Sequence, residues 1–193
     1  MKKKLGIGAV AALALLAVSP VSAAAGDQSY SPIERTRPAF EAPFPCGETW
    51  MAYTHDWHWD KFKMSDWDLP KGQESKGKPV VASADGVIKE AGRYSIDSNY
   101  RGASYVLVDH GRGWSTVYVH VMLESLPAPG TKVKRGQEIA KAGDVGLTPD
   151  DWHGAHLHYE QRFFGHTQTQ RIHGEKLTLV SSPEQTAIVS KNC

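Results

Sequence analysis

The stretch GAHLHYEQ, residues 154–161, places two histidines, His156 and His158, on alternate positions. The surrounding residues are typical of a β-strand, in which side chains at i and i+2 point to the same face. Both imidazoles would therefore face one space, with Cα atoms about 7 Å apart. A packed core gains nothing from two adjacent imidazoles, whereas imidazole is a common metal ligand. The spacing thus indicates a metal centre.

Two other segments supply further ligands or catalytic groups. His120 lies near the end of the strand-like run TVYVHV, and His110 closes the run YVLVDH. The upstream segment 54–70 adds His55, His58, Asp56, Asp60, Asp66 and Asp68. A catalytic zinc takes three protein ligands and keeps one position for water, so two imidazoles and one carboxylate suffice. We expect His153, His166 and His173 to be ordinary surface or hydrogen-bonded residues.

The elements that would position these side chains are β-strands. Residues 103–123 predict two alternating strands around the turn HGRG, and residues 155–164 predict another. Residues 79–92 form two short runs joined at Asp85-Gly86, a dipeptide typical of hairpin turns. No helix of three turns is expected after the N-terminal segment. We predict a mainly β protein, with an antiparallel sheet or sandwich-like core and long loops around a groove.

The N-terminal segment predicts export. Three lysines at positions 2–4 precede an apolar run over 5–18 and small residues at 23–25, which is the pattern of a signal peptide over residues 1–25. The run is too short for a confident membrane span, so we expect a secreted bacterial protein with no stable membrane insertion. An uncleaved anchor is the alternative. Cleavage leaves 19 basic and 21 acidic residues, which argues against a nucleic-acid partner.

The two cysteines and the prolines indicate how the rest is organised. Cys46 and Cys193 predict a disulfide in an oxidising compartment, with two free thiols as the alternative. Residues 26–45 contain four prolines, and we expect an extended leader that wraps or trails rather than packs. Residues 46–165 would form the main domain, and residues 166–193 a C-terminal strand and tail pinned by Cys193.

Three blocks of the chain resemble, in order, the lysostaphin-type (LytM-like) zinc metallo-endopeptidases that cut bacterial peptidoglycan. Residues 66–88 are similar to the family's stretch in which a ligand aspartate precedes a proline, glycines and PV-A-GxV. Residues 105–121 resemble its central hairpin, in which a histidine follows a tyrosine by two. Residues 130–146, followed by GAHLHYE, resemble its glycine-punctuated run into the HxH strand. The resemblance covers about residues 46–164.

The resemblance implies a role for individual residues. His158 would be a zinc ligand, and His156 and His120 would be catalytic histidines. Asp66 fits the ligand aspartate because a proline follows it by four residues; Asp68 is the alternative.

The first ligand histidine departs from the family pattern. Many members place it four residues before the aspartate, where this chain has Phe62. His58 lies eight residues before Asp66 and His55 eleven, and we favour His58 while leaving His55 open. One zinc ion per chain would then be held by His58, Asp66 and His158.

Neighbouring residues could complete the site. Glu160 shares the strand face of His158 and either orients a ligand imidazole or faces solvent, and we favour solvent. The polar, turn-rich segment 94–102 is expected to be a substrate-side loop. Five aromatic residues could line a groove, although core packing is the simpler expectation for any one of them. They are Tyr53, Trp57, Trp59, Trp67 and Trp114.

The resemblance implies a zinc endopeptidase that hydrolyses a peptidoglycan peptide bond with zinc-activated water and two histidines, and we expect it to be a secreted monomer. The absence of HExxH excludes thermolysin-like chemistry. Three rival functions are a non-catalytic module that binds the wall or activates a hydrolase, a swivelling biotinyl or lipoyl carrier, and a metal-scavenging protein. No residue decides which bond is cut, whether the leader is inhibitory, or whose wall is the target.

Overall fold

The structure is a computed structural model that describes residues 33, 36–146 and 154–193. The predicted signal peptide, most of the first half of the leader and His153 lie outside these residues.

The described chain is mainly β, as predicted, with a short 3-10 turn, η1, at Leu123–Ser125. The strands are β1 (Thr49–Tyr53), β2 (Met64–Asp68), β3 (Pro79–Val81), β4 (Gly86–Arg93), β5 (Ser104–Gly111), β6 (Trp114–Val119), β7 (Lys132–Val133), β8 (Glu138–Lys141), β9 (Leu157–Phe163), β10 (His166–Thr167), β11 (Arg171–Ile172), β12 (Glu175–Lys176) and β13 (Thr186–Val189). Among the described helices, none has the length and apolar character that a membrane crossing requires.

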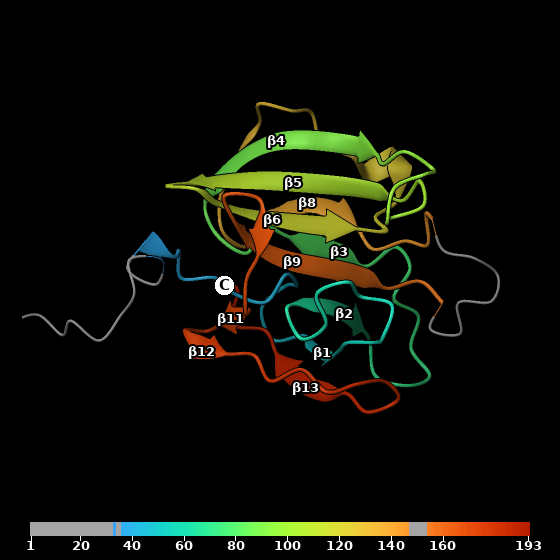
Figure 1. Ribbon diagram of the computed structural model, residues 1–193. Coiled ribbons are helices and arrows are strands. Elements are labelled where there is room, and N and C mark those ends of the chain that lie inside the picture. The colour runs from blue at the N-terminus through green and yellow to red at the C-terminus, as the bar shows by residue number, and fades with distance from the viewer. Residues whose placement is uncertain (1–32, 34–35, 147–153) are drawn as a thin grey trace, which may run out of the picture.

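The main sheet has nine strands and is antiparallel throughout. Its order is β13-β1-β2-β9-β6-β5-β4-β7, with β10 paired to β9. Two smaller sheets, β3-β8 and β11-β12, accompany it. Figure 1 shows β4, β5, β6 and β9 crossing the molecule side by side, with β3 and β8 behind them.

The predicted hairpin around HGRG is confirmed as β5-β6, whereas the one predicted at Asp85-Gly86 is wrong. β3 pairs with β8 in the second sheet, and β4 pairs with β5 and β7 in the main sheet. A Cβ atom on Gly86 would lie 2.6 Å from the carbonyl oxygen of Asp109. A glycine is therefore needed at this position, where the chain passes from the small sheet to the main sheet. The Asp85-Gly86 dipeptide thus connects two sheets and does not form a hairpin turn.

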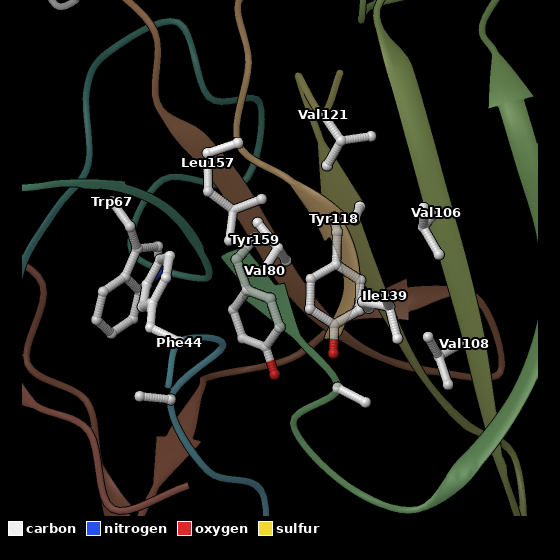
Figure 2. Close-up of a cluster of buried hydrophobic side chains, with 14 of the residues drawn as sticks. Phe44, Trp67, Val80, Val106, Val108, Tyr118, Val121, Ile139, Leu157 and Tyr159 are labelled. Atoms are coloured by element: carbon white, nitrogen blue, oxygen red, sulfur yellow. The ribbon is translucent and has the colours of Figure 1, made fainter. Parts of the chain in front are cut away.

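The core lies between the main sheet and β3-β8. Figure 2 shows Val80 and Ile139 of the small sheet packed among Leu157, Tyr159 and Tyr118 of the main sheet, all of them buried. Because side chains alternate along a strand, the two β9 residues that point into this core send their neighbours to the opposite face. That opposite face of β9 carries the predicted site.

The leader packs, contrary to expectation, over its described part. Phe40 and Phe44 are buried, and Phe44 stacks on Trp50 with ring centroids 3.6 Å apart. Proline limits regular structure but not burial, so the aromatic residues between the prolines still join the core. The disulfide between Cys46 and Cys193 is present and fastens the C-terminus beside this segment.

Candidate metal centre

The centre is built where three neighbouring strands meet. Asp66 on β2 lies directly opposite His158 on β9, and Val119 at the end of β6 lies opposite His158 on its other side. His120 follows β6 immediately, and His156 precedes β9 and bridges to Gly143. The strand register therefore brings the aspartate and three histidines, from distant parts of the sequence, to one place.

Asp66 is buried, 1% exposed, and imidazoles surround its carboxylate. His55 Nε2 lies 3.0 Å from Oδ2, and Oδ1 lies 3.3 Å from His58 Nε2, 3.0 Å from His158 Nδ1 and 3.7 Å from His156 Nε2. Burial alone would raise the pKa of the Asp66 carboxyl, but the nearby charges of His58 and His156, the hydrogen bond from His158 and the adjacent His55 imidazole hold it well below its usual range. The Asp66 carboxylate is thus ionised and could act as a metal ligand.

These atoms fit a zinc ion. Among the described residues, Asp66 Oδ2 accepts no aligned hydrogen bond, although it is buried beside His55 Nε2. Donor atoms of His55, His58 and Asp66 all lie within 4.8 Å of one another. Ligand atoms about 2.0–2.1 Å from a tetrahedral zinc lie about 3.3 Å apart, close to the 3.0–3.3 Å found around Asp66. Two or three imidazole nitrogens with one carboxylate are also a typical zinc donor set.

Hydrogen bonds to the second ring nitrogen distinguish His58 from His55. His58 Nδ1 lies 2.9 Å from the Thr54 hydroxyl, which can accept a hydrogen bond from Nδ1–H and leave the Nε2 lone pair facing Asp66. His55 Nδ1 instead accepts a hydrogen bond from the Trp57 backbone N–H, so a neutral His55 carries its proton on Nε2. His58 is also more buried, 8% exposed, and burial lowers its pKa. The ligand tautomer is therefore available at His58.

His120 and His156 form a pair beside this cluster. Their ring centroids are 4.9 Å apart, and each Nδ1 lies 2.9 Å from a backbone carbonyl, that of Val145 for His120 and that of Gly154 for His156. Each carbonyl accepts a hydrogen bond from the Nδ1–H, so the neutral rings present an Nε2 lone pair. Burial, followed by the charge of His156, lowers the pKa of His120 to about 3.

The backbone around His120 is unusual for a residue with a side chain. His120 has φ of 66°, in the left-handed region that L-residues seldom adopt. A Cβ atom on Gly143 would lie 2.8 Å from the His120 carbonyl oxygen, so only glycine allows this approach. Such local strain is held by surrounding structure and is common at functional sites.

A cavity of about 130 Å³ opens onto the cluster. It is lined by His55, His58, Asp66, His120, His156 and His158, together with Trp57, Trp59, Asn99, Tyr100, Arg101 and Gly146. The segment 94–102, here called the site loop, therefore borders the cavity. Trp57 and Trp59 are 77% and 49% exposed at its rim, whereas Tyr53, Trp67 and Trp114 are buried in the core.

Glu160 does not face solvent, so the favoured prediction for it is wrong. Its side chain is fully buried and accepts hydrogen bonds from His158 Nε2 at 2.9 Å and from Arg162 Nε at 2.6 Å. Burial would raise the pKa of Glu160, but His158 and Arg162 lower it to about 2. Conversely, burial would lower the pKa of His158, yet its hydrogen bonds and the charges of Asp66 and Glu160 raise it to about 9.

Arg162 and Tyr100 were not singled out from the sequence as parts of this network. Arg162 could have been found by continuing the i+2 pattern from His158 through Glu160. Tyr100 could not have been found in this way, because it lies in a loop, where no strand periodicity predicts the direction of a side chain.

The other residues that the sequence offered as ligands or catalytic groups form hydrogen bonds or ion pairs away from the Asp66 cluster, or lie on the surface. Asp68 accepts hydrogen bonds from the hydroxyls of Tyr53 and Ser75, and burial raises its pKa to about 6. His110 lies 2.8 Å from both the Asp85 carbonyl oxygen and the Thr116 hydroxyl. The remaining candidates form ion pairs or lie on the surface: Asp56 pairs with Lys61, Asp60 with Lys63 and His173 with Glu41, and His166 is exposed.

Comparison with known proteins places the chain in a family. The sequence pattern of Peptidase family M23 matches residues 70–171, more than half of the chain. The chain belongs to peptidase family M23. The match contains His120, His156 and His158 but begins after His58 and Asp66, so it does not test these two positions.

Three curated relatives share part of this M23 chain. An uncharacterized metalloprotease of Haemophilus influenzae is 41% identical over 86 residues, 45% of this chain and 16% of the relative. The DD-carboxypeptidase/endopeptidase Mpg of Neisseria meningitidis is 38% identical over 105 residues, 53% of this chain and 22% of the relative. The peptidoglycan DD-endopeptidase ShyB of Vibrio cholerae is 33% identical over 84 residues, 44% of this chain and 17% of the relative. The chain thus matches about a fifth of the length of each relative.

A solved structure shares the fold. Pseudoalterin, an M23 metalloprotease described as deep-sea, is 19% identical, with a TM-score of 0.56 over 74% of this chain and 82% of its own. This similarity shows that the M23 fold is present and extends over most of the described residues.

Proposed function

We propose that this chain is a zinc endopeptidase that hydrolyses peptide bonds in bacterial cell-wall peptidoglycan. The observation that carries the proposal is the buried Asp66, with His58 and His158 at its carboxylate and the His120–His156 pair on the same cavity. Membership of family M23 and the printed names of the Mpg and ShyB relatives support this class of substrate.

His58 Nε2, Asp66 Oδ1 and His158 Nδ1 would hold one zinc ion. When bound, zinc lowers the pKa of a water molecule and polarises a peptide carbonyl. Thr54 and Glu160 keep the ligand imidazoles in the required tautomers. The Thr54 hydroxyl can accept a hydrogen bond from His58 Nδ1–H, and Glu160 accepts one from His158 Nε2–H.

His120 and His156 would move protons. Both rings are held through Nδ1 by backbone carbonyls, so each offers its Nε2 to the cavity. One ring would take the proton of the attacking water, and the other would stabilise charge on the carbonyl oxygen or protonate the leaving amine. The low pKa of His120 keeps that ring neutral at neutral pH, with its Nε2 lone pair free to accept a hydrogen bond.

The proposal includes the location and organisation of the protein. Residues 1–25 would direct export and be removed, residues 46–165 would form the peptidase domain, and residues 166–193 would form its C-terminal extension. The disulfide between Cys46 and Cys193 agrees with an oxidising, extracytoplasmic location. We expect the exported protein to act as a monomer.

A solubilisation assay tests this function. Zinc-loaded protein should release soluble fragments from a suspension of purified cross-linked peptidoglycan, and zinc-loaded His156→Ala should release almost none. Sedimentation of either protein with the insoluble wall reports binding separately. Wall binding without release by the zinc-loaded wild type would contradict the proposal and favour a non-catalytic binding module.

A further inference from the structure

Glu160 is a buried carboxylate that receives hydrogen bonds from three side chains. Its Oε1 accepts one from His158 Nε2 at 2.9 Å and one from the Tyr100 hydroxyl. Its Oε2 accepts one from Arg162 Nε at 2.6 Å. Because a buried carboxylate is costly unless it is paired and hydrogen-bonded, these donors keep Glu160 ionised and in one position.

Tyr100 is the member of this set that comes from outside β9. It belongs to the site loop, lines the cavity, and its hydroxyl also accepts a hydrogen bond from Arg162 Nη2 at 2.6 Å. Its ring stacks on Tyr94 with centroids 4.2 Å apart and meets the His158 ring edge-on at 5.8 Å. Tyr100 therefore reaches His158 through its ring and, by way of Glu160, through a chain of hydrogen bonds.

We propose that Tyr100 is a positioning residue for His158 and acts through Glu160. The inference rests on the proposed function, in which His158 Nδ1 binds zinc. A ligand imidazole needs an acceptor for its second nitrogen, because that acceptor fixes the tautomer and the ring orientation. Glu160 is the acceptor, and the Tyr100 hydroxyl holds Oε1 where His158 needs it. The site loop thereby sets the position of a metal ligand on β9.

Tyr100→Phe, compared with Tyr105→Phe, tests the hydroxyl alone. Tyr105 belongs to the same aromatic stack, 4.1 Å from Tyr94, but its hydroxyl donates to Glu90 at 3.1 Å, away from His158. Zinc affinity is measured by competition with a chromophoric chelator. We expect Tyr100→Phe to bind zinc about 10- to 100-fold more weakly than the wild type and Tyr105→Phe to bind it equally well. Equal affinity in all three proteins overturns the proposal.

Thermal unfolding of the zinc-free proteins separates positioning from folding. Tyr100→Phe keeps the ring contacts with Tyr94, so it should unfold within a few degrees of the wild type. Arg162→Lys is a second variant, which keeps a positive charge beside Glu160 but loses both the Nε donor to Glu160 and the Nη2 donor to Tyr100. It should also weaken zinc binding, and it tests whether the position of Glu160 controls His158 if Tyr100→Phe does not fold. Zinc affinity that falls only in proportion to zinc-free stability overturns the proposal.

The result is distinguishable from the outcome for the proposed function. If the wild type binds zinc and cleaves peptidoglycan while Tyr100→Phe binds zinc as tightly, only the positioning role of Tyr100 is wrong. If the wild type binds zinc without cleaving, and Tyr100→Phe binds it more weakly, the positioning role stands and the peptidase activity is wrong. A wild type that binds no zinc overturns both.

Discussion

Asp66 and His158 face each other across the antiparallel pair β2-β9, with Asp66 Oδ1 3.0 Å from His158 Nδ1. A slip of one residue in this register would turn either side chain toward the core. Burial of Trp67 and Leu157, the neighbours of the two residues and themselves cross-strand partners, opposes such a slip. The same hydrophobic alternation that builds the core therefore fixes the metal-centre geometry.

We predict different consequences for the two histidines of the HxH pair. His158→Ala should lose zinc, because it removes a ligand. His156→Ala should keep about one zinc ion per chain and lose about 10²- to 10⁴-fold in cleavage rate, as expected for removal of a general acid or base. Elemental analysis of the purified proteins, with a fragment-release assay, measures both effects. Equal zinc loss in the two variants would overturn this division of roles.

The upstream histidines offer a second matched pair. Because His58 presents an Nε2 lone pair and His55 carries its proton there, we expect His58→Ala to lose zinc and His55→Ala to retain it. Zinc content after dialysis against a weak chelator gives the answer. The reverse pattern would assign the ligand to His55, which lies only 3.0 Å from Asp66 Oδ2.

The disulfide should be a major source of stability. Cys46 and Cys193 are 147 residues apart in sequence, for which loop-closure entropy predicts about 5 kcal/mol of stabilisation as an upper value. We expect no free thiol in the native protein and a lower melting temperature after reduction or in a double Cys→Ser variant. Two thiols that titrate without denaturant would contradict this.

His110 should contribute to acid sensitivity. Burial lowers its pKa in the folded protein from the ordinary value of 6.5, so the unfolded chain binds the proton more readily. The free energy of unfolding should therefore fall as pH drops below about 6.5. We predict that the difference in this free energy between pH 7 and pH 5, from urea titrations, is smaller in His110→Gln. An unchanged difference would show that His110 is not responsible.

The strand periodicity predicted which histidines gather at the candidate site. The i+2 rule placed His156 and His158 on one face, and alternation in TVYVHV placed His120 at a strand end. These are local properties of the chain, which a single sequence carries. The family resemblance contributed Asp66, which no local pattern selects over Asp68.

The errors share one cause, which is that they depend on tertiary packing rather than on the local backbone pattern. Gly86 was expected in a hairpin turn, but it lies where the chain passes between two sheets, close to the Asp109 carbonyl oxygen. Glu160 was expected in solvent but is covered by Tyr100 and Arg162. Phe44 was expected in a trailing leader but stacks on Trp50. Local propensity does not determine which other parts of the chain pack against each of these residues.

The most direct test of the central claim is mass spectrometry of purified cross-linked peptidoglycan after digestion by the exported form of the protein. Three samples are compared: zinc-loaded protein, protein with a zinc chelator, and chelated protein with zinc restored. We predict new pairs of amine and carboxyl ends that appear with zinc, vanish with the chelator and return on restoration, and their masses name the bond. A folded protein with one bound zinc that produces no new ends, across several wall chemotypes, would contradict the claim.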